Sequence, residues 1–224
     1  AVGGEYTRFL HAYLPKLTQK LREWGLEGQV YFHISDEPNL AQLEAYRAAK
    51  DSVAGLLEGF PVIDALSDYN FYRTGAVEHP ICANDHIHRF LENGVSGVWS
   101  YYCTSQKLRV SNRFFSMPWS RCRVYGVQLF RYQTPGILHW GYNFYYSQYS
   151  IYPIDPYLTT DAGGSFPGGD PFMVYPGQDG RPEESVRMVV MEQALFDLRA
   201  LEALAKKIGR ERAVEFVEQE LGQP

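Results

Sequence analysis

The chain has 224 residues, of which 45% are hydrophobic, and a formal net charge of −5, so it can bury the core of one large domain or of two small ones. Its acidic and basic residues are mixed along the chain, which argues against a basic surface that binds nucleic acid. No apolar run is as long as the about 20 residues that a helix needs to cross a membrane. Three sparse cysteines, Cys82, Cys103 and Cys122, do not form a disulfide framework; they favour a reducing, cytoplasmic compartment and leave secretion open.

Hydrophobic periodicity predicts helices and strands in alternation along the first hundred residues. Residues 5–24 place leucines and aromatic side chains on one helical stripe, which Pro15 kinks or divides, and glycines end this helix before a strand at 29–34. The elements that follow are a helix at 39–57, a strand at 60–65, a helix near 84–93 and a strand at 97–102.

The second half continues this alternation and adds a long loop. A helical stretch within 113–132 precedes a strand at 136–140, and helices at 181–208 and 212–221 make up the C-terminal helical part, residues 183–221. Residues 141–185 form a loop far longer than the usual ~4–6 residues, with a short strand at 172–175. Its many tyrosines favour an ordered, functional loop, suited to a sugar-binding cleft or a wet protein interface.

Strands that alternate with helices predict a parallel sheet with crossover helices, which is an α/β fold. The four or five strands fall short of the eight in a complete barrel, which needs ~250 residues. We therefore predict a single domain over residues 1–224 that forms part of a (β/α)8 TIM-like barrel. Its first strand would expose an edge, which another segment or a second copy of the chain would cover.

Polar or aromatic clusters follow the predicted strands, at the ends where barrel enzymes place their reactive groups. These clusters are Ser35-Asp36-Glu37, Ser67-Asp68-Tyr69-Asn70, Tyr101-Tyr102-Cys103 and Trp140-Gly141-Tyr142-Asn143. Polar residues are common in any loop, but loops do not require large aromatic side chains. The Trp and Tyr members therefore point to function more strongly than the others.

The adjacent carboxylates of Asp36 and Glu37 have two interpretations. Two acids this close repel each other when both are ionised, so one pKa is raised, as an acid/base pair requires. The alternative is a polar strand-to-helix turn in which Asp36 or Ser35 caps the next helix. The motif alone leaves both interpretations open.

Other chemistries have weaker support in the sequence. There is no G-x-S-x-G elbow, P-loop or G-x-G-x-x-G motif, so neither a serine hydrolase nor a nucleotide-binding enzyme is indicated. His86 and His88 lie two residues apart and do not share a helical face, which argues against a metal site, and we expect no cofactor. The pairs Gly163-Gly164 and Gly168-Gly169 are typical of sharp turns.

Five blocks of sequence resemble the catalytic domain of glycoside hydrolase family 123. In chain order they are HISDEP, VWSYYC, GILHWGYNFY, GGDPFMVYPG and RPEESVRMVVMEQALFDLRALEAL, and the last two are the most specific. The resemblance covers about residues 6–221. It implies a (β/α) barrel, usually preceded by a β-sandwich, and release of N-acetylgalactosamine from β-glycosides. By this resemblance HISDEP corresponds to the middle of that barrel, so this chain would form its C-terminal half, with about three further βα units outside this chain.

The resemblance also implies roles for individual residues. Glu37 would be the general acid and then the general base, and Asp36 would orient the substrate's own 2-acetamido group, which attacks the anomeric carbon. Trp140 would form a wall of the sugar pocket, with contacts to the sugar from Tyr101, Tyr142, Asn143 and Asp170. We expect these side chains to converge on one face, whereas Trp99 either joins them or packs in the core. The partner is then a β-linked N-acetylhexosamine glycan. The alternative is a non-catalytic carbohydrate-binding or structural relative.

Overall fold

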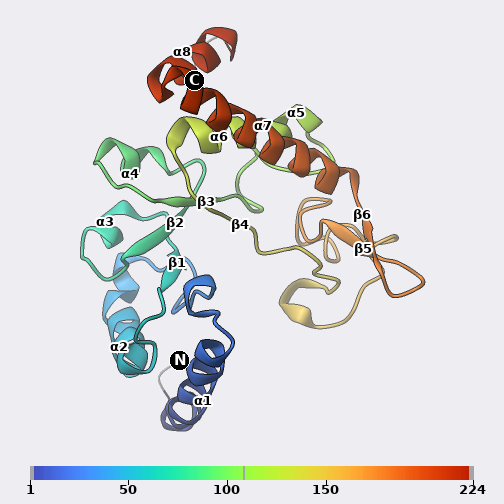
Figure 1. The fold of residues 1–224 in the computed structure, drawn as a ribbon. Coiled ribbons are helices and arrows are strands. Elements are labelled where there is room, and N and C mark those ends of the chain that lie inside the picture. Colours follow the sequence, from blue (N-terminus) through green and yellow to red (C-terminus); the bar gives the residue numbers. More distant parts are fainter. Residues whose placement is uncertain (1–2, 108, 222–224) are drawn as a thin grey trace. The chain divides into compact units, whose positions relative to one another are not determined.

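The computed structural model describes residues 3–107 and 109–221 and has the predicted mixed α/β composition, with parallel strand pairs and helices between the strands (Figure 1). The chain forms two compact units, Ala1–Trp99 and Ser100–Pro224. The single domain over residues 1–224 stays a prediction.

The helices of the first unit follow the sequence pattern closely. α1 spans Gly4–Glu23, and Pro15 lies inside this one helix without dividing it. The helix predicted at 39–57 is confirmed as α2, Leu43–Val53, which lies between two 3-10 turns. Asn39 begins the first of these turns through a capping box, because its side chain accepts from the Ala41 N–H and its own N–H donates to Gln42.

Only part of the apolar stripe on α1 is buried. Leu14 packs against Val53 and Leu57 in one core cluster of the first unit. Phe9 and Tyr13 belong to the same predicted stripe but are exposed, and their rings stack with centroids 5.3 Å apart. The stripe is therefore wider than the face that α1 buries in this unit.

The predicted strand at 29–34 is wrong for most of its length. Glu27–Gln29 is a 3-10 helix, and Phe32 makes an isolated parallel bridge to Val62. The next strand, β1, is Ile63–Ala65 and pairs in parallel with β2, His79–Ala83. The sequence pattern did not predict β2, because four of its five residues are buried and show no alternation.

Two short helices complete the first unit. α3 is Tyr69–Tyr72, and the Asp68 side chain caps it by accepting from two backbone N–H groups. α4 is His88–Glu92, which is shorter than the helix predicted near 84–93, and Gly94 follows it with a φ of +74°. Both helices contribute side chains to one core cluster, which contains the buried residues Cys82, Ile87, Phe90 and Val98.

The second unit contains another parallel pair. β3 is Trp99–Tyr101 and β4 is Ile137–Leu138, paired through Ser100 with Ile137 and through Tyr101 with Leu138. Both strands lie inside the predicted ranges. The helical stretch predicted within 113–132 begins only after Pro118 and forms two helices, α5 (Trp119–Arg123) and α6 (Tyr125–Tyr132).

The C-terminal helices pack against α5 and α6. α7 spans Val186–Ile208 and lies along both of them, and α8 spans Arg210–Leu221 (Figure 1). Gly126 allows α6 to approach closely, because a Cβ atom there would lie 1.8 Å from the Ala194 carbonyl oxygen of α7. The predicted start of this helix at 181 is wrong, because Ser185 caps α7.

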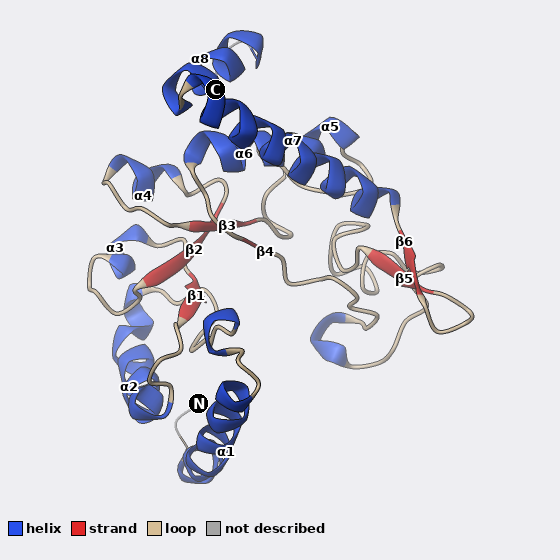
Figure 2. Cartoon of the chain, in the orientation of Figure 1, coloured by secondary structure: helices blue, strands red, loops and turns tan. Residues whose placement is uncertain are grey.

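The long loop is largely as predicted, with a small hairpin near its end. β5, Val174–Pro176, pairs in antiparallel fashion with β6, Pro182–Glu184. Figure 2 shows the chain between β4 and β5 as loop, apart from the single 3-10 turn Gln148–Ser150. This loop exposes many aromatic side chains, among them Tyr142, Tyr149 and Tyr157.

Candidate active site

Asp36 and Glu37 lie on an exposed turn that follows the Phe32 bridge. The backbone of Glu37 has a φ of +43°, a left-handed conformation that is uncommon outside glycine, Asn and Asp. Its N–H donates to the carbonyl oxygen of Ala65 at 3.0 Å, which ties the turn to the end of β1. The two carboxylates are thus held beside the carboxyl end of a parallel strand, where reactive groups of α/β proteins gather.

Asp64, in the middle of β1, organises the segment that leads into this turn. Its side chain is 0% exposed, and its Oδ1 accepts from the N–H groups of Ile34 at 2.8 Å and Ser35 at 2.9 Å. The Tyr46 hydroxyl donates to Oδ2 at 2.5 Å, and His33 Nδ1 lies 2.8 Å from Oδ1. Both oxygens of a buried carboxylate are therefore satisfied by groups that flank the Asp36-Glu37 turn.

The Asp64 carboxylate changes the acid–base properties of its neighbours. The hydrogen bond that the His33 ring donates to Asp64 raises the pKa of His33, and the negative charges of Asp64 and Asp36 add to this effect against an opposing contribution from burial. Burial, and then the hydrogen bond to Asp64, raise the pKa of the Tyr46 hydroxyl. Tyr46 is thus a neutral donor at any physiological pH.

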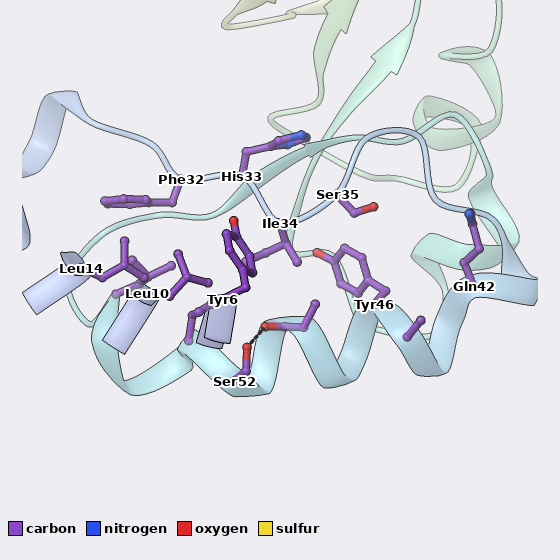
Figure 3. Close-up of a pocket in the computed structure, with 14 residues that line it drawn as sticks. Tyr6, Leu10, Leu14, Phe32, His33, Ile34, Ser35, Gln42, Tyr46 and Ser52 are labelled. Atoms are coloured by element: carbon purple, nitrogen blue, oxygen red, sulfur yellow. Dashed lines mark hydrogen bonds between the residues drawn. The ribbon is translucent and has the colours of Figure 1, made fainter. Parts of the chain in front are cut away.

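A pocket of 360 Å³ lies beside this segment, between α1, α2 and residues 32–35 (Figure 3). Its wall is mainly apolar, with Leu10, Leu14 and Phe32 on one side. Ser35 and Tyr46 add polar groups, and in Figure 3 the Tyr46 hydroxyl points from α2 toward the chain at Ile34 and Ser35. Asp36 and Glu37 are not among its lining residues, so this pocket is separate from the two carboxylates.

In the second unit, Trp140 is anchored through its edge. The indole Nε1–H donates to Asp170 Oδ2 at 3.0 Å, and the ring packs against Phe144 and Phe166 with centroids 5.2 and 4.9 Å away. Trp140 nevertheless remains 40% exposed. A fixed edge and an accessible ring are the properties that a stacking wall needs.

His139 and Arg113 hold Asp170 and Trp140 in place. His139 Nε2 lies 3.2 Å from Asp170 Oδ1, while His139 Nδ1 accepts from Arg113 at 2.8 Å and from the Gly141 N–H at 3.0 Å. Two donors at Nδ1 assign the ring proton to Nε2, which makes His139 a neutral donor to Asp170. Burial lowers the pKa of His139, in agreement with this state.

Arg113 is a buried cation in this network. It donates to the backbone carbonyl oxygens of Gly141 and Asp170, the latter at 2.9 Å. Burial lowers its pKa, and the nearby Asp170 charge opposes this effect. Arg113 therefore joins the chain just after β4 to the chain at Asp170, which lies 57 residues after Arg113 itself.

The remaining predicted residues occupy different environments. Tyr142 and Asn143 are exposed and follow Trp140 after one residue, Gly141. Tyr101 is 6% exposed, and Asp170 is 0% exposed with both carboxylate oxygens occupied, so as placed each is covered by protein. Trp99 is partly buried and meets the Tyr31 ring edge-on at 5.1 Å. The convergence of Asp36 and Glu37 with Trp140 and Asp170 on one face stays a prediction.

Several residues of the two networks were not predicted from the sequence, namely His33, Tyr46, Asp64, Arg113 and His139. One signal for Asp64 was present, because an acid inside the apolar strand FPVIDA is unusual and a buried acid needs partners. For His139 the signal was its position in the block GILHWGYNFY, directly before Trp140. Arg113 had no such signal, because its partners are distant in the sequence.

The part of the chain that the structure describes contains neither a metal-binding cluster nor a membrane-spanning helix. Within 3–107 and 109–221, no three His, Cys, Asp or Glu side chains gather as a metal site. No helix in that same part of the chain is long and apolar enough to cross a membrane.

The comparisons with known proteins agree on one family. The family model named "Glycoside hydrolase 123, catalytic domain" matches residues 1–204. The fold is similar to that of a family 123 glycoside hydrolase from Clostridium perfringens, studied for glycolipid glycan hydrolysis, with a TM-score of 0.64 and 14% sequence identity. The match covers 92% of this chain and 36% of that one, so this chain spans about a third of that structure's length. A comparison with curated proteins found no match. Because the family model matches most of its length, the chain belongs to the glycoside hydrolase 123 family, in the catalytic domain.

Proposed function

We propose that this chain carries the acid/base pair of a retaining glycosidase that hydrolyses β-N-acetylgalactosaminides or related β-N-acetylhexosaminides with assistance from the substrate. The observation that supports this most is the exposed Asp36-Glu37 turn at the end of β1, anchored by the Glu37 N–H to Ala65 and, through Ser35, by Asp64. Family membership supports the reaction class. The helical turn that follows is capped by Asn39 and not by Ser35 or Asp36, which removes the capping role from the alternative interpretation.

In this reaction Glu37 acts twice. It first gives a proton to the glycosidic oxygen while the bond from that oxygen to the anomeric carbon breaks. The carbonyl oxygen of the 2-acetamido group attacks the anomeric carbon from the other face and forms an oxazoline-like ring. Glu37, now ionised, then takes a proton from water as the water oxygen attacks the same carbon and reopens the ring. The two inversions retain the anomeric configuration.

Asp36 stabilises the intermediate ring. The acetamido nitrogen gains positive charge as its carbonyl oxygen attacks, and a carboxylate that accepts from this N–H offsets that charge. Retaining enzymes that supply their own nucleophile hold two carboxyl groups ~5–5.5 Å apart across the bond. A substrate that brings its own nucleophile removes this requirement, so neighbouring residues on one turn suffice.

The sugar-binding part of the proposal rests on the second unit. Trp140 offers an exposed ring whose edge is fixed by Asp170, and Tyr142 and Asn143 are exposed beside it. We assign sugar stacking to Trp140 and hydroxyl or acetamide contacts to Tyr142 and Asn143. Asp170 is buried and acts through Trp140, whose indole N–H it accepts, while the contact of Tyr101 with the sugar stays a prediction.

The same proposal includes the architecture. The parallel pairs β1–β2 and β3–β4, with helices between their strands, are the elements from which a (β/α)8 barrel is built. We propose that the chain forms the C-terminal half of such a barrel and that another segment or a second copy completes the pocket. The solved relative, of which this chain covers 36%, supports the first of these options.

The full-length protein should hydrolyse an aryl 2-acetamido-β-glycoside and release the β-anomer first, because two inversions at one carbon restore its configuration. Proton NMR of the anomeric signal during the first minutes measures this. A thiazoline analogue of the intermediate should inhibit competitively, and glycolipid-derived glycans should be tested as natural substrates.

Release of the α-anomer would contradict substrate assistance. Binding of the sugar without hydrolysis, unchanged by Glu37→Gln, would instead identify a carbohydrate-binding module.

Trp140→Ala should lower kcat/KM about 10–100-fold, because a buried large apolar contact contributes ~1.5–3 kcal/mol and each 1.4 kcal/mol is tenfold. Asp170→Asn should lower it less, since the ring remains but its anchor is weakened. Initial rates on an aryl glycoside measure both. Trp119→Ala is a matched control, because Trp119 lies in the same unit and is similarly exposed, at 45% against 40%. Equal losses for Trp119→Ala and Trp140→Ala would contradict the stacking role.

A further inference from the structure

We propose that Asp64 is the positioning residue of the Asp36-Glu37 pair, holding the backbone that presents the two carboxylates; this inference rests on the proposed function. The Asp64 side chain is 0% exposed, so it acts through its neighbours and not on the sugar. Asp64 was not among the predicted site residues, although an acid inside the apolar strand FPVIDA is unusual.

The hydrogen bonds around β1 show how Asp64 takes the place of a strand ladder. The parallel pairing begins normally, with the Phe32 N–H donating to Pro61 and the Ile63 N–H donating to Phe32, each at 2.9 Å. The next bonds of a regular ladder would run between backbone groups. Here the N–H groups of Ile34 and Ser35 donate to Asp64 Oδ1 instead.

This substitution determines where the chain turns. Because one side-chain oxygen receives two successive N–H groups, Ile34 and Ser35 cannot continue as a strand, and the chain bends into the Asp36-Glu37 turn. The backbone pairing resumes at Glu37, whose N–H donates to Ala65 at 3.0 Å. The segment from Ile34 to Glu37 is therefore fastened to residues 64 and 65 at both ends of the turn.

The second oxygen of Asp64 connects the turn to the helix behind it. The Tyr46 hydroxyl of α2 donates to Oδ2 at 2.5 Å, and the Tyr46 ring packs edge-on against Phe71 with centroids 5.3 Å apart. Hydrogen bonds to an ionised acceptor are about twice as strong as neutral ones. Asp64 thus links β1, α2 and the turn through one carboxylate, and a rigid turn keeps the Glu37 proton donor in register with the leaving oxygen.

A positioning role and a merely structural role predict different kinetics. If Asp64 only stabilised the fold, its removal would lower activity equally on all substrates, in proportion to the unfolded fraction. If it positions Glu37, the loss should depend on how much the leaving group needs a proton. Misplacement of a catalytic group by about 1 Å can cost ~10²-fold in rate.

The test compares variants of the full-length protein on phenyl and 2,4-dinitrophenyl 2-acetamido-β-glycosides. Asp64→Ala should lower kcat on the phenyl glycoside about 10–100-fold and on the dinitrophenyl glycoside less than about threefold, with KM nearly unchanged. Asp64→Asn should recover part of the loss, because its amide oxygen still accepts from Ile34 and Ser35. In a Glu37→Gln background, Asp64→Ala should cause no further loss on the phenyl glycoside.

Controls separate this proposal from the proposed function and from folding defects. Ser185→Ala removes the cap of α7 and should lower the unfolding temperature while leaving kcat per folded molecule unchanged. NMR of the His33 ring in Asp64→Asn should show a lower pKa, because the Asp64 hydrogen bond is the main cause that raises it. Should Asp64→Ala fail to fold, Tyr46→Phe removes one donor and should lower kcat a few-fold on the phenyl glycoside alone.

Three outcomes would overturn the positioning role in an active enzyme. The first is an equal loss of kcat on both glycosides for Asp64→Ala. The second is a double variant, Asp64→Ala with Glu37→Gln, whose loss of kcat equals the product of the two single losses. The third is a kcat for Asp64→Asn that is no higher than that for Asp64→Ala. For Tyr46→Phe, an unchanged kcat or an equal loss on both glycosides would do the same. A wild-type protein that hydrolyses neither glycoside overturns the proposed function, and the positioning role with it.

Discussion

Glu37→Gln is expected to lower kcat/KM on phenyl 2-acetamido-β-glycosides about 10²–10⁴-fold, the contribution of a positioned general acid. On 2,4-dinitrophenyl glycosides the loss should be much smaller for the first step, because that leaving group departs without a proton. Azide should then restore turnover of the dinitrophenyl substrate, since azide attacks the anomeric carbon without losing a proton to a base. Initial rates and NMR detection of a β-glycosyl azide measure both effects.

Glu44→Gln is the matched control for this prediction. Glu44 lies in α2 of the same unit, and its side chain is 88% exposed, so the same change of charge there should leave kcat/KM within about twofold. A Glu37→Gln variant that loses activity equally on both leaving groups and gains nothing from azide would show that Glu37 is not the acid/base residue. The polar-turn interpretation would then be the better one.

Asp36→Asn is expected to lower kcat about 10²–10³-fold on 2-acetamido substrates, as the removal of an electrostatic stabiliser does. The neutral amide cannot offset the positive charge that develops on the nitrogen of the oxazoline-like ring. Inhibition by a thiazoline analogue should weaken in parallel, because the analogue presents the same ring. Rates on matched 2-acetamido and 2-hydroxy aryl glycosides, together with inhibition constants, measure the effect.

The comparison of the two sugars makes this prediction specific. A 2-hydroxy glycoside has no acetamido group for Asp36 to assist, so its slow hydrolysis should be nearly unaffected by Asp36→Asn. Asp51→Asn, which changes an exposed carboxylate of α2, should leave both rates unchanged. If Asp36→Asn and wild type hydrolysed the acetamido substrate equally well, Asp36 would be only a turn residue.

The helices were the part of the fold that sequence reasoning predicted best. α1 and α2 carry a 3.6-residue apolar repeat, and both lie where the pattern places them, with Asn39 capping the 3-10 turn that precedes α2. The start of α7 was predicted too early, because Pro182–Glu184 joins the hairpin with β5. The partner strand β5 lies across a turn, so the local sequence of Pro182–Glu184 does not show that these residues form a strand and not the first turn of a helix.

The strands were predicted less well from the sequence than the helices. β2 is buried along most of its length, so it has no alternation, and the predicted strand at 29–34 is interrupted by bonds to a side chain 30 residues away. Periodicity reports which face of an element is buried. It contains no information about which distant group accepts a particular N–H.

The sequence by itself determined the α/β class and the family, and it predicted Asp36, Glu37 and Trp140 as site residues, because short motifs and periodic patterns are local properties of the chain. Only the tertiary structure decided what holds these residues: the Asp64 carboxylate beneath one turn, and the His139, Arg113 and Asp170 network beneath the indole. The physical reason is burial. A buried carboxylate must find donors wherever the fold brings them, here 18 to 31 residues along the chain, and separations of that size follow from packing and not from local sequence.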